Sequence, residues 1–275
     1  MIEKHDDATY KQALLDLLKR VDQVLTKAGI EYFAVYGTCL GAVRDCGIIP
    51  WDDDIDIAVW RKDFKFTLRI LEQSGEGIFA GDRDSVPGCP LRCGRIFNRV
   101  SAQSTLEERR AYIDLHVIDF AVASRLNFYW LVLWYVGISR IIQRRRRRSL
   151  GRYRLLYAFA DLVALPFVFC RTKLLEKVAD WLYICDQTTQ FVKITFDGTR
   201  KRYLKEDFTK SIRVRFNTGK IPVPVGYARY LSECYGDWRT PPSENQRKSH
   251  AFDPKGEKWT VLLPSDDDRA LMPIA

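Results

Sequence analysis

Residues 37–60 read GTCLGAVRDCGIIPWDDDIDIAVW, and four of the five positions 52–56 are aspartate. The apolar residues that alternate with the last two aspartates predict a strand over roughly 53–60 whose apolar side chains enter the core. Asp54 and Asp56 would then share the opposite face, with their Cα atoms about 6–7 Å apart. This crowding of like charge on one short strand calls for a counter-charge.

A divalent cation would supply that counter-charge. Two ionised carboxylates this close repel each other, so one of them would hold its proton unless a cation lay between them. Mg²⁺, or Mn²⁺ in its place, prefers carboxylate oxygens together with substrate phosphates. The sequence therefore predicts a metal site on Asp54 and Asp56, with Asp52 as a further candidate ligand. The alternative is an acidic strand end in solvent, because D-x-D alone is a weak motif.

The segment before the aspartates supports the phosphate interpretation. Residues 30–36 predict a buried strand, and Gly37 and Thr38 break it. Gly37 has no side chain to block a phosphate, and Thr38 carries a hydroxyl donor. A strand, a Gly-Thr turn and an acidic strand together are the arrangement of nucleotidyltransferases, which take a third acid from a neighbouring strand. Asp114 is the predicted third acid, and Asp119, which a turn or cap would also explain, is the second choice.

The rest of the chain predicts an α+β (α/β-like) fold, a nucleotidyltransferase-like mixed sheet flanked by helices. Helical periodicity and extended apolar runs alternate along the sequence. Helices are expected near 8–28, 62–73 and 227–234, and further strands near 95–100, 111–118, 191–196 and 212–216.

A change of composition at residue 126 divides the chain into three parts. Residues 1–125 form the predicted catalytic core, and residues 171–275 complete the same domain. Between them, residues 126–170 form a predicted helical insertion that is basic and aromatic.

The insertion predicts contact with an anionic membrane surface. Residues 140–154 contain eight arginines between two apolar, aromatic stretches. The longest uncharged run there, 126–139, is too short to span a bilayer, which takes about 20 apolar residues. Aromatic residues that flank the arginines suit a membrane interface better than nucleic acid. A helical hairpin with the arginines at its exposed tip is the alternative.

Charge and cysteine content are consistent with a cytoplasmic protein that meets an anionic partner. Lysine and arginine number 44 against 35 acidic residues, a formal charge of +9 over 275 residues. Such an excess favours phosphates, nucleic acid or a membrane as partner. Seven irregularly spaced cysteines indicate reduced thiols, and the polar first residues do not resemble a signal peptide.

Three blocks of the sequence resemble the LicD/fukutin-related phosphotransferase family. The stretch YGTCLGAVRDCGIIPWDDDIDIAV at 36–59 resembles the family's first motif, and YIDLHVID at 112–119 resembles its second. A third block, IPVPVGYARYLSECYGDWRTPP at 221–242, is similar to its V-P and Y-G-D motifs and is followed by His250. In the second block, His116 and Val117 stand where Phe-Pro is usual.

The resemblance implies an enzyme that moves a phospho-alcohol, phosphocholine or a phospho-polyol, from a CDP-activated donor. The acceptor would be a hydroxyl of a cell-surface glycan, such as lipopolysaccharide or teichoic acid, or of its lipid-linked precursor, and CMP would be released. Asp54, Asp56 and Asp114 would be catalytic, with the cation neutralising the donor's diphosphate. The enzyme would work at the cytoplasmic face of the plasma membrane without nucleic acid.

Two more residues of the first block are candidate substrate ligands. Arg44 would clamp a phosphate through two N–H groups, or would form a surface ion pair with an aspartate nearby. Trp51 would stack on the cytosine or face a choline head group, or would pack beside Pro50. Tyr235 to Asp237 would fold back near the site, or would only end a helix at Gly236.

Two other function classes remain open at this stage. A nucleotidyltransferase that uses a nucleoside triphosphate and releases pyrophosphate would need the same three aspartates. A binding module without activity would not need the complete acidic set.

Overall fold

The computed structural model describes residues 7–82, 85, 93–99, 111–120, 189–194, 201–244 and 247. The chain divides into two compact units, one of 1–118 with 206–275 and one of 119–205. The predicted insertion at 126–170, with its arginine run, lies outside the described residues, so the predicted three-part division stays a prediction.

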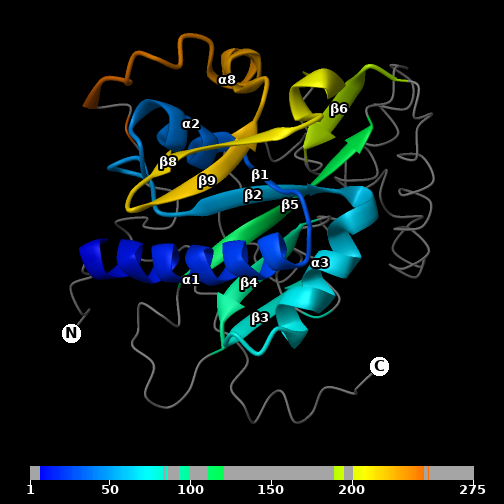
Figure 1. The fold of residues 1–275 in the computed structure, drawn as a ribbon. Coiled ribbons are helices and arrows are strands. Elements are labelled where there is room, and N and C mark those ends of the chain that lie inside the picture. Colours follow the sequence, from blue (N-terminus) through cyan, green and yellow to red (C-terminus); the bar gives the residue numbers. More distant parts are fainter. Residues whose placement is uncertain are drawn as a thin grey trace, which may run out of the picture. The chain divides into compact units, whose positions relative to one another are not determined.

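The first unit contains a mixed sheet whose strands lie in the order β1-β2-β5-β4-β3 (Figure 1). Only β2 and β5 are parallel along this path, and the other neighbours are antiparallel. The strands are β1 Phe33–Ala34, β2 Ile55–Trp60, β3 Ile78–Asp82, β4 Gly94–Asn98 and β5 Tyr112–Phe120. With its flanking helices this sheet confirms the predicted α+β class.

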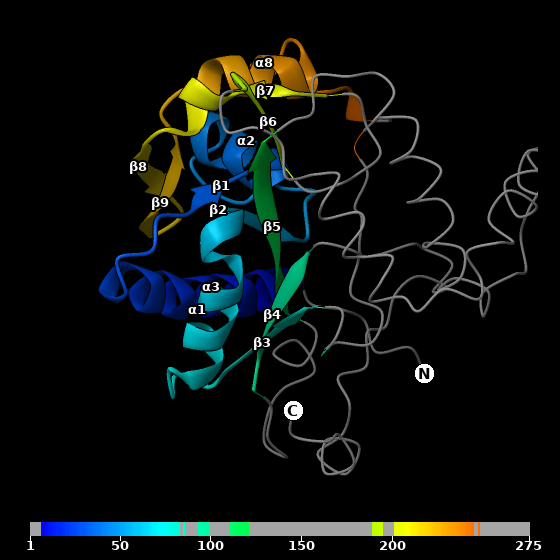
Figure 2. The same cartoon turned by 90° about the vertical axis from the view of Figure 1, so that its right-hand side faces the viewer.

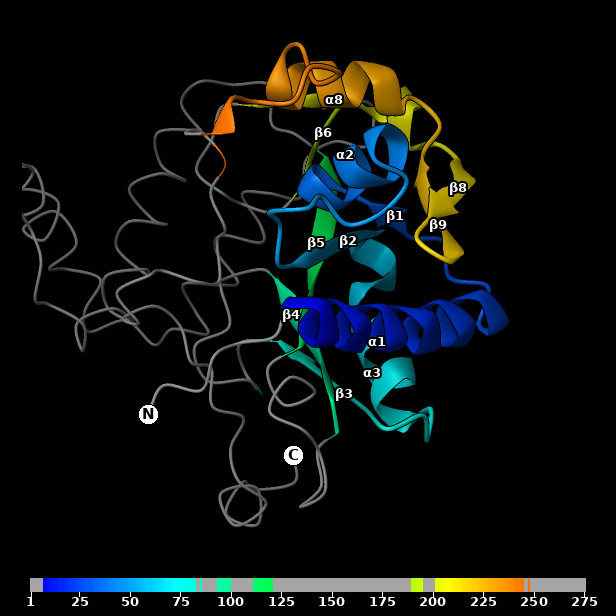
Figure 3. The same ribbon diagram turned by 90° about the vertical axis from the view of Figure 1, so that its left-hand side faces the viewer.

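Two helices cover one face of this sheet. Figures 2 and 3 show α1 (Asp7–Lys27) and α3 (Arg61–Gln73) on the same side of it. The apolar positions that recur along α1 at helical spacing are buried, as the sequence predicts: Leu14, Leu17, Leu18, Val21 and Leu25. The apolar side chains of β2 and β5 are buried as well, and their burial fixes the orientation of the aspartates between them.

The remaining elements of this unit pack around α2 (Tyr36–Arg44). They are the two-stranded sheet of β8 (Ser211–Phe216) and β9 (Gly219–Pro224), and the helix α8 (Tyr227–Tyr235). Figures 1 and 3 show α8 beside α2, so the two segments are neighbours despite their distance in sequence.

The structure differs from the sequence-based expectation at several places. The strand predicted over roughly 53–60 begins only at Ile55, so Asp54 lies in the loop before β2 and does not share a strand with Asp56. The strand predicted over 30–36 is only the two residues of β1, because Tyr36 adopts a left-handed backbone with φ 48° that turns the chain. Gly37 and Thr38 lie in the first turn of α2 instead of a separate turn. β3 and β9 were not expected; β9 contains Pro222 and Pro224, which a strand paired on one side tolerates.

The second unit is described only in part. Its strands β6 (Phe191–Ile194) and β7 (Tyr203–Leu204) form an antiparallel pair. The strand predicted over 191–196 is therefore present over its described residues. Within the described parts of the chain, no helix is both long enough and apolar enough to cross a bilayer.

An ion pair between a buried carboxylate and a half-exposed arginine anchors the start of α8. Asp207 is 2% exposed and accepts hydrogen bonds from Arg229 of α8, with Nε 3.0 Å from Oδ1. Gly226, directly before the helix, packs so closely that a Cβ there would lie 1.9 Å from Asp207 Oδ1. The absence of a side chain at position 226 therefore lets the helix and the ion pair coexist.

We expect Gly226→Ala to destabilise the protein by about 1–3 kcal/mol, because the methyl group must displace a buried carboxylate that is already paired. The measurement is the free energy of unfolding in urea. Gly219→Ala is the matched control, since a Cβ at Gly219 meets only Phe216 O at 3.9 Å, an ordinary contact. Equal stability of the two variants would contradict this account of α8.

Candidate active site

A cleft of about 760 Å³ brings the first and third sequence blocks together. One wall comes from α2, the loop after it and the start of β2, and the other from the end of α8 and the segment that follows. Of the predicted site residues it is lined by Gly37, Arg44, Trp51, Asp52, Asp54 and Asp56, and from the third block by Tyr235, Asp237 and Trp238. The fold thus places Tyr235 and Asp237 beside the aspartates.

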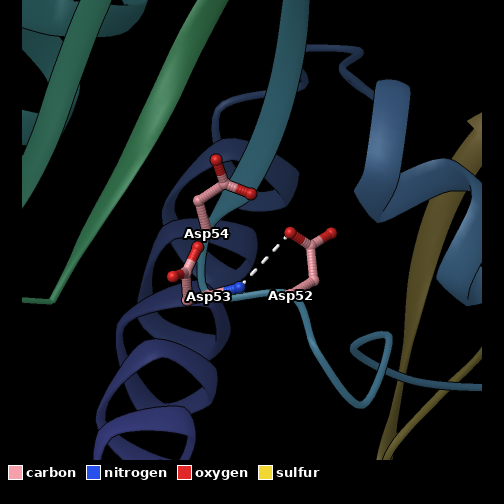
Figure 4. Close-up of side chains that lie close together, drawn as sticks. All are labelled: Asp52, Asp53 and Asp54. Carbon is pink, nitrogen blue, oxygen red and sulfur yellow. Dashed lines mark hydrogen bonds between the residues drawn. The ribbon is translucent and has the colours of Figure 1, made fainter. Parts of the chain in front are cut away.

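Three consecutive aspartates form the acidic loop, residues 52–54, at the entrance to β2. One carboxylate oxygen from each of the three side chains lies within 4.8 Å of the corresponding oxygens of the other two. Figure 4 shows the three side chains close together, with the backbone N–H of Asp53 donating to Asp52 Oδ1 at 3.3 Å. Asp53 is 2% exposed, whereas Asp52 and Asp54 line the cleft. Asp53 thus contributes to the negative field from inside the protein.

The two strand carboxylates lie side by side on neighbouring strands. Asp56 of β2 and Asp114 of β5 are register partners, and Asp114 is also the partner of Arg95 on β4. Because register partners point to the same face of a sheet, these three charged side chains form a row across it. The predicted pairing of Asp114 with the acidic strand is therefore present in the fold.

Burial and mutual repulsion hold a proton on this cluster. Burial is the main cause that raises the pKa of Asp54 to about 9, and the negative charges of Asp56, Asp52, Asp53 and Asp114 add to it. Burial also raises the pKa of Asp114, against the opposing effect of Arg95. A group of carboxylates that resists ionisation in a cleft is the donor set that Mg²⁺ or Mn²⁺ would relieve. The residues present therefore fit a divalent cation.

Each strand carboxylate has a basic partner. Arg95 Nε donates to Asp114 Oδ1 at 2.8 Å, and Arg95 is 8% exposed. His116 Nε2 lies 2.8 Å from Asp56 Oδ1. The sequence placed His116 on the same strand face as Asp114 but gave it no role, and Arg95 was not singled out at all. Strand alternation could have indicated that His116 lies on the same face as Asp114. Only the pairing of β4 with β5 shows that Arg95 is a partner of Asp114.

Gly37 and Thr38 contact the aspartates from α2. A Cβ at Gly37 would lie 2.5 Å from Asp52 Oδ2, so glycine allows the acidic loop to pack against the first turn of the helix. Thr38 is 4% exposed, and its Oγ1 accepts a hydrogen bond of 2.8 Å from the backbone N–H of Asp56. Both residues thus position carboxylates, and their contact with a substrate phosphate stays a prediction.

Arg44 and Trp51 line the cleft and interact with each other. Arg44 forms a two-armed ion pair with Asp45, with Nη2 2.8 Å from Oδ2, which is the ion-pair alternative considered for it. Its guanidinium lies 5.8 Å from the centre of the Trp51 ring, and that of Arg247 lies 4.6 Å from the same ring. Trp51 therefore already meets two cationic groups at the cleft.

A strained residue connects α2 with α8. Tyr36 has a positive φ of 48°, which is rare for a residue with a bulky side chain. Its backbone N–H donates to Tyr230 Oη at 2.9 Å, and its ring meets the His116 ring edge-on at 5.3 Å between centres. The helix from the third block therefore holds the residue from which α2 begins.

Of the two remaining candidates, Asp119 is not among the residues that line the cleft. Asp119 lies five positions after Asp114 on β5, so in a regular strand its side chain points to the opposite face. His250 lies outside the described residues.

Comparison with known proteins finds similarity to one family. Residues 29–116 match the family model described as "LicD/FKTN/FKRP, nucleotidyltransferase domain". Over these residues, which include the first sequence block and most of β5, the chain is similar to the LicD/fukutin-related family that its motifs resemble.

Three relatives show how far the similarity reaches. The lipopolysaccharide cholinephosphotransferase LicD of Haemophilus influenzae is 24% identical over 247 residues, 86% of this chain and 92% of that protein. The human ribitol-5-phosphate transferase FKTN is 34% identical over 64 residues, 23% of this chain and 14% of that protein. An uncharacterized protein of Rickettsia prowazekii is 46% identical over 61 residues, 22% of this chain and 23% of that protein. Similarity to the last two is confined to a short segment.

The raised pKa of Asp54 predicts a pH-dependent stability. Without a cation, the folded protein holds a proton up to pH of about 9 that the unfolded chain releases above about pH 4. The contribution of Asp54 to the stability of the folded protein is therefore fully present below about pH 4, and it is lost as the pH rises toward 9. We expect the unfolding temperature, measured in chelator, to fall between pH 5 and pH 9.

Asp54→Asn should flatten this dependence, since it removes the titrating group while it keeps the shape of the side chain. Asp63→Asn, on α3 and outside the cleft, is the control that should keep the wild-type slope. Identical slopes in all three proteins would show that the acidic cluster does not hold the proton.

Proposed function

We propose that this protein transfers a phospho-alcohol, phosphocholine or a phospho-polyol, from a CDP-activated donor to a hydroxyl group of a glycan, and releases CMP. The acceptor would be a cell-surface glycan or its lipid-linked precursor. The observation that carries the proposal is that Asp54 and Asp56 line a cleft that residues of the third block also line, while Asp114 lies in register beside Asp56.

The relatives support the type of reaction. The names of two of them describe the transfer of cholinephosphate in connection with lipopolysaccharide and the transfer of ribitol 5-phosphate. The longer alignment, which spans most of both chains, is with the cholinephosphotransferase. The cleft, at about 760 Å³, is within the usual range for a small-molecule ligand.

The proposed metal ligands are Asp54 and Asp56, with Asp52 as a further one. A bound Mg²⁺ or Mn²⁺ would supply charge neutralisation for the donor's diphosphate and for the departing CMP. These three side chains line the cleft, and burial together with the neighbouring negative charges raises the pKa of Asp54, so ionising this cluster favours a cation at this place.

The transfer itself needs one bond to form and one to break. The acceptor oxygen bonds to the phosphorus that carries the alcohol, and the bond from that phosphorus to the oxygen of CMP breaks. The acceptor's proton goes to a carboxylate, for which we propose Asp114, the alternative being that Asp114 completes the metal site. The hydrogen bond from Arg95 fixes the orientation of this carboxylate.

The other site residues would bind the donor. We assign contact with its phosphates to Gly37, Thr38 and Arg44, all on α2 beside the acidic loop. Trp51 would face the cytosine or the alcohol head group across the cleft. Tyr235, whose ring is 45% exposed and lines the same cleft, is placed to meet either substrate.

A CMP-release assay tests this function. Purified protein with Mn²⁺ and a panel of CDP-alcohols should release CMP, faster when a glycan acceptor is present. Asp54→Asn, Asp56→Asn and Asp114→Asn should each lower the rate by at least about 100-fold, because each removes a charge that the reaction uses. Chelator should abolish the release.

Asp119→Asn is the matched control. Asp119 is on the same strand as Asp114 but on its opposite face, so this variant should keep most of the activity. Release of pyrophosphate from a nucleoside triphosphate, with no CMP from any CDP-alcohol, would favour the nucleotidyltransferase alternative. Normal turnover of the three site variants would refute the assignment of the carboxylates.

We also propose that the protein works in the cytoplasm, bound peripherally to the inner face of the plasma membrane through residues 126–170. The support is the sequence alone: eight arginines between aromatic, apolar stretches, each worth about 1 kcal/mol near an anionic surface. Binding there would keep the enzyme near a lipid-linked acceptor.

The protein should therefore sediment with vesicles that contain anionic lipid and partly dissociate at high salt, because salt screens the attraction. Replacing the arginines at 144–148 with glutamine should weaken sedimentation and leave CMP release with a water-soluble acceptor intact. Equal sedimentation with neutral and anionic vesicles would contradict the electrostatic part of the proposal.

A further inference from the structure

His116 lies beside Asp56 and Tyr36, which both line the cleft. It lies on β5 two positions after Asp114, hence on the same face, and its Nε2 is 2.8 Å from Asp56 Oδ1. The side chains of His116 and Asp56 are each 13% exposed, so the contact is largely shielded from water. A hydrogen bond in such a place is not easily exchanged for one to solvent.

The imidazole ring is held in place by a second contact. The ring of Tyr36 packs edge-on against it, at 5.3 Å between centres and 79° between planes. Tyr36 is itself fixed by the hydrogen bond from its backbone N–H to Tyr230 of α8. The direction in which Nε2 points is therefore set by packing from the third sequence block.

We propose that His116 is a positioning residue that orients the Asp56 carboxylate for cation binding. Fixing Asp56 Oδ1 by a hydrogen bond fixes the plane of the carboxylate and thus the direction of its other oxygen in the cleft. This inference rests on the proposed function, because it takes Asp56 as a ligand of the divalent cation.

The second strand carboxylate is held in the same manner. Arg95 donates to one oxygen of Asp114, as His116 contacts one oxygen of Asp56. Ligands held by a hydrogen bond from a neighbouring side chain lose metal affinity, about 10–100-fold, when that neighbour is removed. His116 stands where the family's second motif usually has phenylalanine, so this partner of Asp56 is a departure of this sequence from the usual pattern.

Three substitutions separate the hydrogen bond from the ring. His116→Phe keeps an aromatic ring against Tyr36 and removes the N–H group. His116→Gln places an amide N–H close to the position of Nε2 and removes the ring. In His116→Asn the amide nitrogen lies too near the backbone to reach Asp56. This variant therefore loses the hydrogen bond, as His116→Phe does, and also lacks an aromatic ring.

The measurement is the affinity of the full chain for Mn²⁺, from the electron paramagnetic resonance signal of the free ion, in the absence of donor and acceptor. We expect His116→Phe and His116→Asn to weaken Mn²⁺ binding about tenfold, and His116→Gln to stay within about threefold of wild type. The Mn²⁺ concentration for half-maximal CMP release should shift by the same factors. If one of the first two variants does not fold, judged by circular dichroism, the other decides.

The inference is overturned if His116→Phe and His116→Asn bind Mn²⁺ as the wild type does. It is also overturned if His116→Gln binds as weakly as they do, because restoring the hydrogen-bonding group would then not restore the affinity. Weaker binding by Asp54→Asn and Asp56→Asn, with no effect of His116→Phe, would overturn this inference alone. If the wild type binds no Mn²⁺, both this inference and the proposed metal site fail.

Discussion

Mutual repulsion of carboxylates at the start of β2 is the constraint on which the site depends. Asp52, Asp54 and Asp56 line one cleft, and Asp114 lies in register beside the last of them. Burial is the larger cause of the raised pKa of Asp54, and the repulsion adds to it. The proposed divalent cation would relieve both effects.

The surrounding structure supplies what keeps these carboxylates in place. Thr38 binds the backbone of Asp56 from α2, while Arg95 from β4 contacts Asp114. Buried polar groups of this kind are stable only when each has a partner, so the sheet, the helix and the acidic loop must form together. Loss of any one of these contacts would leave a buried charge or N–H group unpaired.

The third sequence block stabilises the site without contributing to its acidic row. α8 is fixed at its first turn by the ion pair of Arg229 with Asp207, and in its middle Tyr230 accepts the N–H of Tyr36. Its end brings Tyr235 to the cleft. The family resemblance of this block, distant in sequence from the aspartates, thus has a structural explanation, since it holds the left-handed residue from which α2 starts.

The sequence by itself determined the class of fold and the acidic strand. Alternation of apolar and acidic residues is a local property, and it was enough to assign Asp56 and Asp114 to one side of their strands, although Asp54 lies in the loop before β2. The tertiary structure alone decided which strands are neighbours, and so showed that Arg95 meets Asp114. Local patterns could not reveal that Gly37 belongs to a helix and packs against Asp52, or that Pro222 lies in a strand. Packing between segments that are distant in sequence determines each of these features. For the same reason strand alternation assigned His116 to a face but identified no partner for it. Its contact with Asp56 depends on the register of β2 against β5, which long-range contacts set.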